Sequence, residues 1–394
     1  MDQSQPFPGK ASIVRLVQQQ DKANGNAAFE ATEDVVRERA ELTLVSGSLA
    51  FSSPDQLLPA EWEQAIESLT GALGIDAHWV SSDQPVSLIE KARRAVGTGN
   101  ALHTPAFAPW RIISPTVFQL GKENLAARDA QWVASYLFDF GAACPAANGS
   151  VDLVLMSPCP QTCVSDDPVV GPLPRLNTLA SMVRAAADEG RKSLAIVVRE
   201  AARATLATRL LGFDASLNEA SINVEFVSIE EAVMKMQRGS LEWDAVIAMP
   251  ELRGVVFAML QQATGISGPW PMLWFDRGLR MVTCEALDRA GVAIDLDATA
   301  LVHSLALFAH HSASQYAAQQ FFQSWATVRD SGVVTPARSS SAPYVNEIEE
   351  AAFIDRAASN GVHSSRPLPS WKGIGCEDRQ CEKSAQPVRL SLVQ

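Results

Sequence analysis

The sequence predicts an α/β fold, and three short apolar runs near its middle carry that prediction. The runs span residues 193–198, 223–227 and 243–249, and they have the length and the β-branched content of buried strands. Segments with helical spacing separate them at residues 201–211 and 229–237. Strands that alternate with helices of about ten residues are typical of crossover units in a parallel sheet.

Further elements extend this pattern on both sides of the three runs. Residues 151–156 have the composition of a buried strand, and residues 175–187 place an apolar stripe on one helix face. Strands are also expected at 41–46, 74–80, 271–275 and 279–283, and helices at 57–66, 298–310 and 314–329. Residues 96–120 are rich in Gly, Pro and aromatic residues, so we interpret them as an irregular connection.

Composition and charge exclude several classes of protein. The 394 residues carry a net charge of −12, whereas a general nucleic-acid binder needs clustered Lys and Arg to neutralise phosphates. No window reaches the roughly 18–20 uninterrupted apolar residues of a membrane helix. The N-terminus lacks the apolar core of a signal peptide. We therefore expect a cytoplasmic globular protein that binds neither nucleic acid nor membrane.

The cysteines match no common disulfide or metal pattern. They lie at positions 144, 159, 163, 284, 376 and 381. In a chain of this size without a secretion signal, free thiols are expected rather than a disulfide framework. The spacings Cys159–Cys163 and Cys376–Cys381 differ from the C-x2-C spacing of structural zinc sites. A zinc site is therefore not expected.

Three segments in the centre of the chain follow one another at a spacing that an enzyme family shares. They are EEAVMKMQR at residues 230–238, WDAV at 243–246 and PELRGVVFAM at 250–259. The family has D-N-A-x-M-Q-L-V-R, then x-F-D-V, then P-N-L-x-G-D-I-x-S-D. The chain thus resembles the isocitrate/isopropylmalate dehydrogenases (β-decarboxylating dehydrogenases), over roughly residues 40–330, as a divergent member.

The resemblance implies an isopropylmalate-dehydrogenase-like fold of two α/β/α lobes with a discontinuous first lobe. Residues 1–115 and 250–334 would form this first, larger lobe, and residues 116–249 would form the second. The family pairs through the second lobe, which implies a homodimer or a heteromer with an active paralogue. Residues 335–394 shift to Ser, Pro and Gly, so we expect a disordered tail with one short helix at 347–358.

The resemblance assigns catalytic and metal positions. Arg199 occupies the position of the catalytic lysine, and Glu230 occupies an acidic position that reaches the partner's site in the family. Glu230 and the nearby Glu251 are the candidate ligands for Mg²⁺ or Mn²⁺, since hard cations accept carboxylates. The other two metal aspartates of the family fall on Val255 and Met259, which offer no oxygen.

The resemblance also assigns substrate and cofactor positions. Arg128 lies in a segment similar to N-x-A-L-R, and Arg175 opens a helix that begins with T-R in the family, so both are candidates to bind substrate carboxylates. Asp288 and Gly291 match two positions of the loop that holds the adenine end of NAD(P). The H-G-S-A-P core of that loop is missing here.

These departures leave three hypotheses about function. An arginine stays protonated at neutral pH, so Arg199 cannot act as a base. The family's N-terminal glycine loop and its tyrosine segment are also absent. The leading hypothesis is a pseudoenzyme on the dehydrogenase scaffold with a binding, regulatory or assembly role. The competing one is an active oxidoreductase that acts on a 2-hydroxy (di)carboxylic acid with NAD(P), Mg²⁺ or Mn²⁺ and a rearranged site. A third is an unrelated α/β binding protein.

Overall fold

The computed structural model of the chain describes its central and later parts. The described residues are 41–47, 60–82, 106–119, 129–338, 345–359 and 368–375, and within 129–338 they omit 142, 147, 166, 214–221, 239–240, 288–296 and 313–314. The chain divides into two units, Met1–Glu38 and Arg39–Gln394. All described residues belong to the second unit, which is the one treated below.

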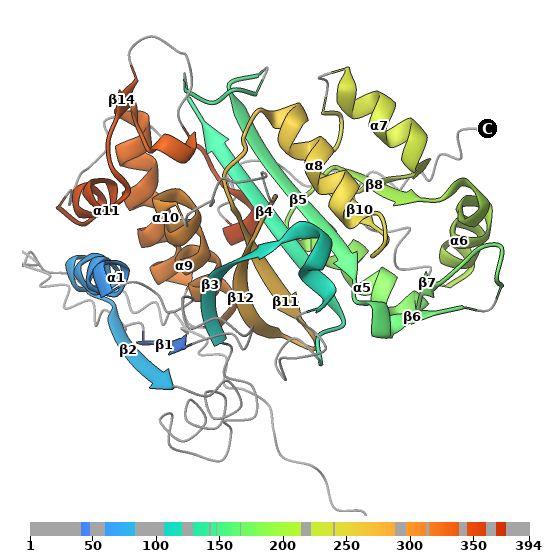
Figure 1. The fold of residues 1–394 in the computed structure, drawn as a ribbon, viewed down its shortest axis with the longest axis horizontal. Helices are drawn as coiled ribbons and strands as arrows, with labels where there is room; N and C mark the ends of the chain where they lie inside the picture. Colours follow the sequence, from blue (N-terminus) through green and yellow to red (C-terminus); the bar gives the residue numbers. More distant parts are fainter. Residues whose placement is uncertain are drawn as a thin grey trace, which may run out of the picture. The chain divides into compact units, whose positions relative to one another are not determined.

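An eight-stranded mixed sheet forms the centre of this unit (Figure 1). Its order is β3-β12-β11-β4-β5-β10-β8-β9. The strands are β3 (Ala106–Ile113), β4 (Trp132–Phe140), β5 (Ser150–Pro158), β8 (Ser193–Val198), β9 (Asn223–Ser228), β10 (Ala245–Ala248), β11 (Trp270–Phe275) and β12 (Leu279–Ala286). Strands β5, β10, β8 and β9 are parallel, whereas β4 and β11 are antiparallel to both of their neighbours. The α/β class predicted from the sequence is confirmed.

Helices cover both faces of the parallel strands, which explains why these strands are mainly apolar and mostly buried. Helix α5 (Leu176–Asp188) packs beside α6 (Glu200–Phe213), and α7 (Ile229–Gln237) packs beside α8 (Arg253–Thr264). The hydroxyl of Ser135 bonds to Arg253 of α8, while that of Tyr136 bonds to Glu189 at the end of α5. Because adjacent strand residues point to opposite faces, the two helix pairs lie on opposite faces of the sheet.

The antiparallel part of the sheet carries a second group of helices. Helix α9 (Ala298–Ser312) packs on β11 and β12, and α10 (Gln315–Asp330) packs along α9. Helix α11 (Glu350–Ser359) contacts α1 (Ala60–Ala72), as Figure 1 shows. Smaller pairs are formed by β1 (Glu41–Gly47) with β2 (Asp76–Ser82), β6 (Cys163–Val164) with β7 (Leu173–Pro174), and β13 (Val333–Val334) with β14 (Asn346–Glu347).

One predicted irregular segment is regular in the structure. Residues 106–113 form β3 and Ser114–Gln119 form the 3₁₀ helix η3, so the interpretation of 96–120 as an irregular connection is wrong there. Strand β3 lies at the edge of the sheet and pairs with β12 alone. Its register shifts between Phe107 and Arg111. Pro109 has no backbone N–H to donate, but an edge strand with an irregular register tolerates a proline.

Two parts of the expected disordered tail are packed into the structure. Phe353 and Ile354 of α11 are fully buried, and so is Trp371, which precedes the 3₁₀ helix η7 (Lys372–Ile374). The short helix expected at 347–358 is present as α11. The prediction of disorder rested on the average Ser, Pro and Gly content of residues 335–394, and an average does not reveal a few buried apolar residues. Among the described residues, no helix is both long enough and apolar enough to cross a membrane.

Candidate functional site

The carboxyl ends of the four parallel strands meet at one edge of the sheet, where ligands of open α/β sheets bind. Strand β10 lies between β5 and β8, so the chain reverses its direction across the sheet at this point. Arg199 follows β8, Glu230 opens the helix after β9, and Glu251 follows β10. Three of the residues singled out from the sequence therefore lie at the same edge.

Arg199 and Glu251 form an ion pair at this edge. The Nε of Arg199 lies 3.4 Å from Oε1 of Glu251, and their side chains are 60% and 30% exposed. The pair forms because β8 and β10 are neighbours, with Ile247 opposite Ile196 and both strands ending two residues later or less. Such an exposed pair adds at most about 1 kcal/mol to stability. The pair also determines which charges this edge presents. The guanidinium of Arg199 stays protonated, and it binds the carboxylate of Glu251.

A second arginine links the two helices that begin at this edge. Arg203 of α6 lies 3.5 Å from Glu200 and 3.1 Å from Glu231 of α7. Glu231 also forms a capping box with Ser228, whose hydroxyl accepts a hydrogen bond from the Glu231 N–H at 3.2 Å. Both carboxylates near Arg203 are thus engaged, whereas Glu230 is exposed in the first turn of α7.

The segment after β5 brings two thiols to the same edge. Burial raises the pKa of Cys159 to about 12. Burial also raises the pKa of Cys163 to about 12, and the negative charge of Glu251 contributes to that rise. The backbone N–H of Arg175 donates to the carbonyl of Thr162 at 3.0 Å, which fixes this segment to the start of α5. Both thiols therefore remain protonated at neutral pH, and neither is an active nucleophile.

Within one chain, the described residues at this edge do not form a complete site for a divalent metal ion. Among the described residues, no three His, Cys, Asp or Glu side chains gather closely enough to hold one. Glu251 is paired with Arg199, and Val255, at a metal position of the family, is an exposed residue of α8. Since Glu230 reaches the partner's site in the family, the assignments of Glu230 and Glu251 as metal ligands stay predictions.

The remaining predicted site residues are divided between the described and the undescribed parts of the chain. Arg175 is exposed at the N-cap of α5, on the edge that also carries Arg199. Arg128, Asp288 and Gly291 lie outside the described residues. Their assignments to substrate and cofactor stay predictions.

Sequence reasoning missed a buried ion pair directly behind the edge. Arg253, in the first turn of α8, and Glu285, in β12, are almost completely buried, with Nη2 2.5 Å from Oε2. Ser114 and Ser135 donate to the two oxygens of Glu285 at 2.6 Å and 2.5 Å. Ser157 accepts from Nη1 of Arg253 at 2.9 Å. The signal was present in the sequence, because both charges stand within strongly apolar runs.

This network has a structural role that bears on the site. Each oxygen of Glu285 accepts from a serine and from Arg253, so the buried carboxylate is fully hydrogen-bonded. A buried charge with such partners fixes geometry, although it adds little net stability compared with an apolar core. The start of α8, two residues after Glu251, is thereby held against β4, β5 and β12.

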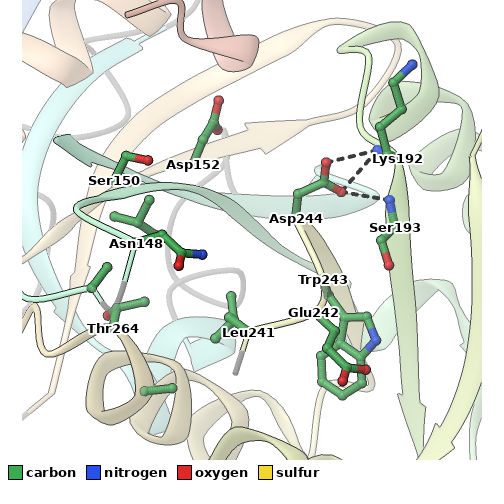
Figure 2. Close-up of a pocket in the computed structure, with 13 residues that line it drawn as sticks. Asn148, Ser150, Asp152, Lys192, Ser193, Leu241, Glu242, Trp243, Asp244 and Thr264 are labelled. Atoms are coloured by element: carbon green, nitrogen blue, oxygen red, sulfur yellow. Dashed lines mark hydrogen bonds between the residues drawn. The ribbon is translucent and has the colours of Figure 1, made fainter. Parts of the chain in front are cut away.

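A pocket of about 440 Å³ lies at the opposite edge, where β5, β8 and β10 begin (Figure 2). Its lining combines carboxylates with apolar side chains: Ala146, Asn148, Ser150, Val151, Asp152, Lys192, Ser193, Leu241, Glu242, Trp243, Asp244, Ala263 and Thr264. Asp244 accepts from the backbone N–H of Lys192 at 2.9 Å and from that of Ser193 at 2.9 Å. These residues come from separate elements, so no local pattern could have indicated the pocket.

Comparisons with known proteins give a fold and no activity. No family model matches the sequence, and no curated protein does. Among solved structures, the chain is similar to the TT0538 protein from Thermus thermophilus, with a TM-score of 0.51 and 14% identity over 90% of this chain and 72% of that one. It is also similar to isocitrate dehydrogenase from Methylococcus capsulatus, with a TM-score of 0.49 and 16% identity over 81% of this chain and 98% of that one. The first similarity indicates a shared fold; neither assigns a reaction.

Proposed function

We propose that the chain is a divergent relative of the isocitrate/isopropylmalate dehydrogenases that acts by binding or assembly rather than by oxidation. The observation that carries this proposal is the Arg199–Glu251 ion pair at the carboxyl edge of the sheet. In the family, the position of Arg199 holds a lysine that transfers a proton. Here it holds a group that cannot release one at neutral pH.

The ion pair also weakens the metal site that oxidation would need. A carboxylate that is paired with a guanidinium is a poorer ligand for a hard cation than an unpaired carboxylate, because the ion pair must break before the cation binds. Glu251 is in that state, and positions 255 and 259 offer Val and Met. The same edge carries the guanidinium groups of Arg199 and Arg175, which would hold a small carboxylate ligand by charge-assisted hydrogen bonds.

The two-lobed arrangement and the oligomer are part of the same proposal. Residues 1–115 with 250–334 would form one lobe, and residues 116–249 the other. Pairing through the second lobe, as a homodimer or with an active paralogue, is supported by an apolar side chain on α7 of that lobe, and the adjacent helix α8 of the first lobe adds another beside it. Met234 and Val255 are 53% and 52% exposed, and large exposed apolar groups on neighbouring elements favour a protein contact.

The competing function is oxidation of a 2-hydroxy (di)carboxylic acid with NAD(P) and Mg²⁺ or Mn²⁺ at a rearranged site. A thermal-shift experiment separates the two functions, because a ligand selective for the native state must raise its melting temperature. We expect a 2-hydroxy dicarboxylate alone to raise the melting temperature of the wild type, and to leave that of Arg199→Gln unchanged.

The same thermal-shift experiment, repeated with nicotinamide and metal, tests the competing oxidoreductase function. Addition of NAD or NADP together with Mg²⁺ or Mn²⁺ is expected to add nothing to the shift. A further rise of several degrees that needs both nicotinamide and metal would support the oxidoreductase instead.

Size-exclusion chromatography with light scattering on wild type, Met234→Ser and Val255→Ser tests the pairing surface: a dimer that becomes monomeric in both variants supports it.

A further inference from the structure

A short segment near the C-terminus fills the space between the two helix groups on one face of the sheet. Trp371 is fully buried there, with its ring stacked on Phe138 of β4 at 5.5 Å between centroids. It also lies 4.6 Å from the ring of His303 in α9 and 5.8 Å from that of Phe322 in α10. Trp371 therefore anchors the described residues 368–375 in an aromatic slot, together with the fully buried Ile374.

The next residue, Lys372, contacts two aspartates at the beginnings of β5 and β10. The backbone N–H of Lys372 donates to Oδ2 of Asp152 at 2.9 Å, and its Nζ lies 2.6 Å from Oδ2 of Asp244. These aspartates stand at the beginnings of β5 and β10, and both line the pocket of Figure 2. The segment thus joins α9 and α10 on one side to the wall of the pocket on the other.

The rest of the segment fits closely through both side chains and backbone, and the side chain of Ile374 is fully buried. The carbonyl of Ile374 accepts a hydrogen bond from the side-chain amide of Gln315. Gly373 lies so close to Tyr136 that a Cβ would be 3.1 Å from Cδ1 of that ring. The fit is therefore specific for this sequence of Trp, Lys and Gly.

The slot that receives Trp371 is not ideal for it. Nε1 of Trp371 and Nε2 of His303 are both buried without a hydrogen-bond partner. Burial lowers the pKa of His303 well below its ordinary value, so the ring stays neutral and adds no charge to the slot. Because each unsatisfied buried group costs free energy, docking of the segment gains less than its buried area suggests. The half-buried contact of Lys372 with Asp244 then adds to the difference in free energy between the docked and the released segment.

We propose that residues 368–375 are a releasable strap, and that the contact between Lys372 and Asp244 is its release point. In the docked strap the ammonium of Lys372 balances the charge of Asp244 on the pocket wall. Release leaves Asp152 and Asp244 without these contacts, makes that wall more acidic, and opens the aromatic slot of Phe138, His303 and Phe322. A cation bound to Asp244 and a docked strap exclude each other. This inference does not depend on the proposed function.

Hydrogen exchange on the full-length chain, followed by mass spectrometry, tests the strap. Lys372→Met removes the ammonium and keeps the apolar stem. Its matched control is Lys235→Met, since Lys235 also lies 2.6 Å from its carboxylate partner, Glu225, with 34% exposure against 35% for Lys372. We expect exchange in 368–375 and around Asp244 to rise about fivefold in Lys372→Met alone, as for an opening smaller than global unfolding. Lys372→Arg should stay close to wild type.

Two results would overturn the proposal. In one, exchange in 368–375 is the same in Lys372→Met and in the Lys235→Met control. In the other, Lys372→Met accelerates exchange in the segment and in the central strands β4 and β5 together, which makes the segment part of the global folding unit. If Lys372→Met does not fold, wild type at low and high salt replaces it: release at high salt confined to 368–375 and its contacts supports the strap, and uniform behaviour contradicts it.

Discussion

Arg199 and Glu251 approach to 3.4 Å, Nε to Oε1, where the neighbouring strands β8 and β10 end. Their pairing places a permanent cation and its counter-charge at the edge where an open α/β sheet binds ligands. Because a guanidinium stays protonated at neutral pH, Arg199 does not exchange protons with a ligand there.

Substitution of Arg199 by Gln is expected to change ligand binding more than stability. An exposed ion pair adds at most about 1 kcal/mol, so the free energy of unfolding measured with urea should fall by no more than that. Isothermal titration with a 2-hydroxy dicarboxylate should lose most of its heat. Arg238→Gln is the control, because Arg238 is an exposed arginine at the C-cap of α7, away from the carboxyl ends of the strands. Equal binding by both variants would show that Arg199 holds no ligand.

Removal of Arg253 is expected to be strongly destabilising. Arg253→Met leaves the buried Glu285 with hydrogen bonds from Ser114 and Ser135 alone, and such breaks of buried ion pairs cost about 3–5 kcal/mol in free energy of unfolding. The double variant Arg253→Met with Glu285→Gln should recover part of that loss. Asp129→Asn, which affects the exposed pair with Arg280 at 3.3 Å, should cost less than about 1 kcal/mol. The network has no special role if the two single variants are equally stable in urea.

The buried thiols are expected to resist alkylation in the folded protein. Burial raises the pKa of Cys144 to about 11 and those of Cys159 and Cys284 to about 12, so the reactive thiolate is scarce at about pH 8. Iodoacetamide treatment followed by peptide mass spectrometry should leave these three unmodified until denaturant is added. Modification of Cys159 in native protein as fast as in unfolded protein would contradict the described packing.

Stability is expected to fall with rising pH because of one glutamate on α11. Oε2 of Glu350 accepts the N–H of Ala298 at 2.7 Å, and burial, followed by the charge of Asp297, raises its pKa to about 7. Between its ordinary pKa of about 4.3 and about 7, the unfolded chain has lost this proton while the folded chain keeps it. The contribution of Glu350 therefore declines through that window and is constant above it.

The isosteric variant Glu350→Gln isolates this effect. It should gain stability relative to wild type from about pH 5 to about pH 8 in urea unfolding, because it has no proton to lose. Glu349→Gln, at the neighbouring position, is the control and should follow the wild-type curve. A constant difference between Glu350→Gln and wild type across this range would mean that Glu350 is ionised in the folded state throughout.

The parallel half of the sheet could be predicted from the sequence, and the antiparallel half could be predicted only in part. Strand β8 is a continuous apolar run between helices, which local pattern identifies. Strand β4 has the sequence WVASYLFDF, where Ser135 and Asp139 interrupt the pattern because they bond to partners far along the chain. Likewise, the partners of Arg199 and Glu285 are set by strand order, which no local window contains.

The central proposal is that this scaffold binds a carboxylate without oxidising it. Its most direct test is the reduction of NAD or NADP by the purified full-length chain supplied with 2-hydroxy dicarboxylates and Mg²⁺ or Mn²⁺, measured by absorbance against Glu251→Gln. We expect no reduced nicotinamide above the rate without protein, in wild type and variant alike. Steady reduction by the wild type that Glu251→Gln abolishes would contradict the proposal.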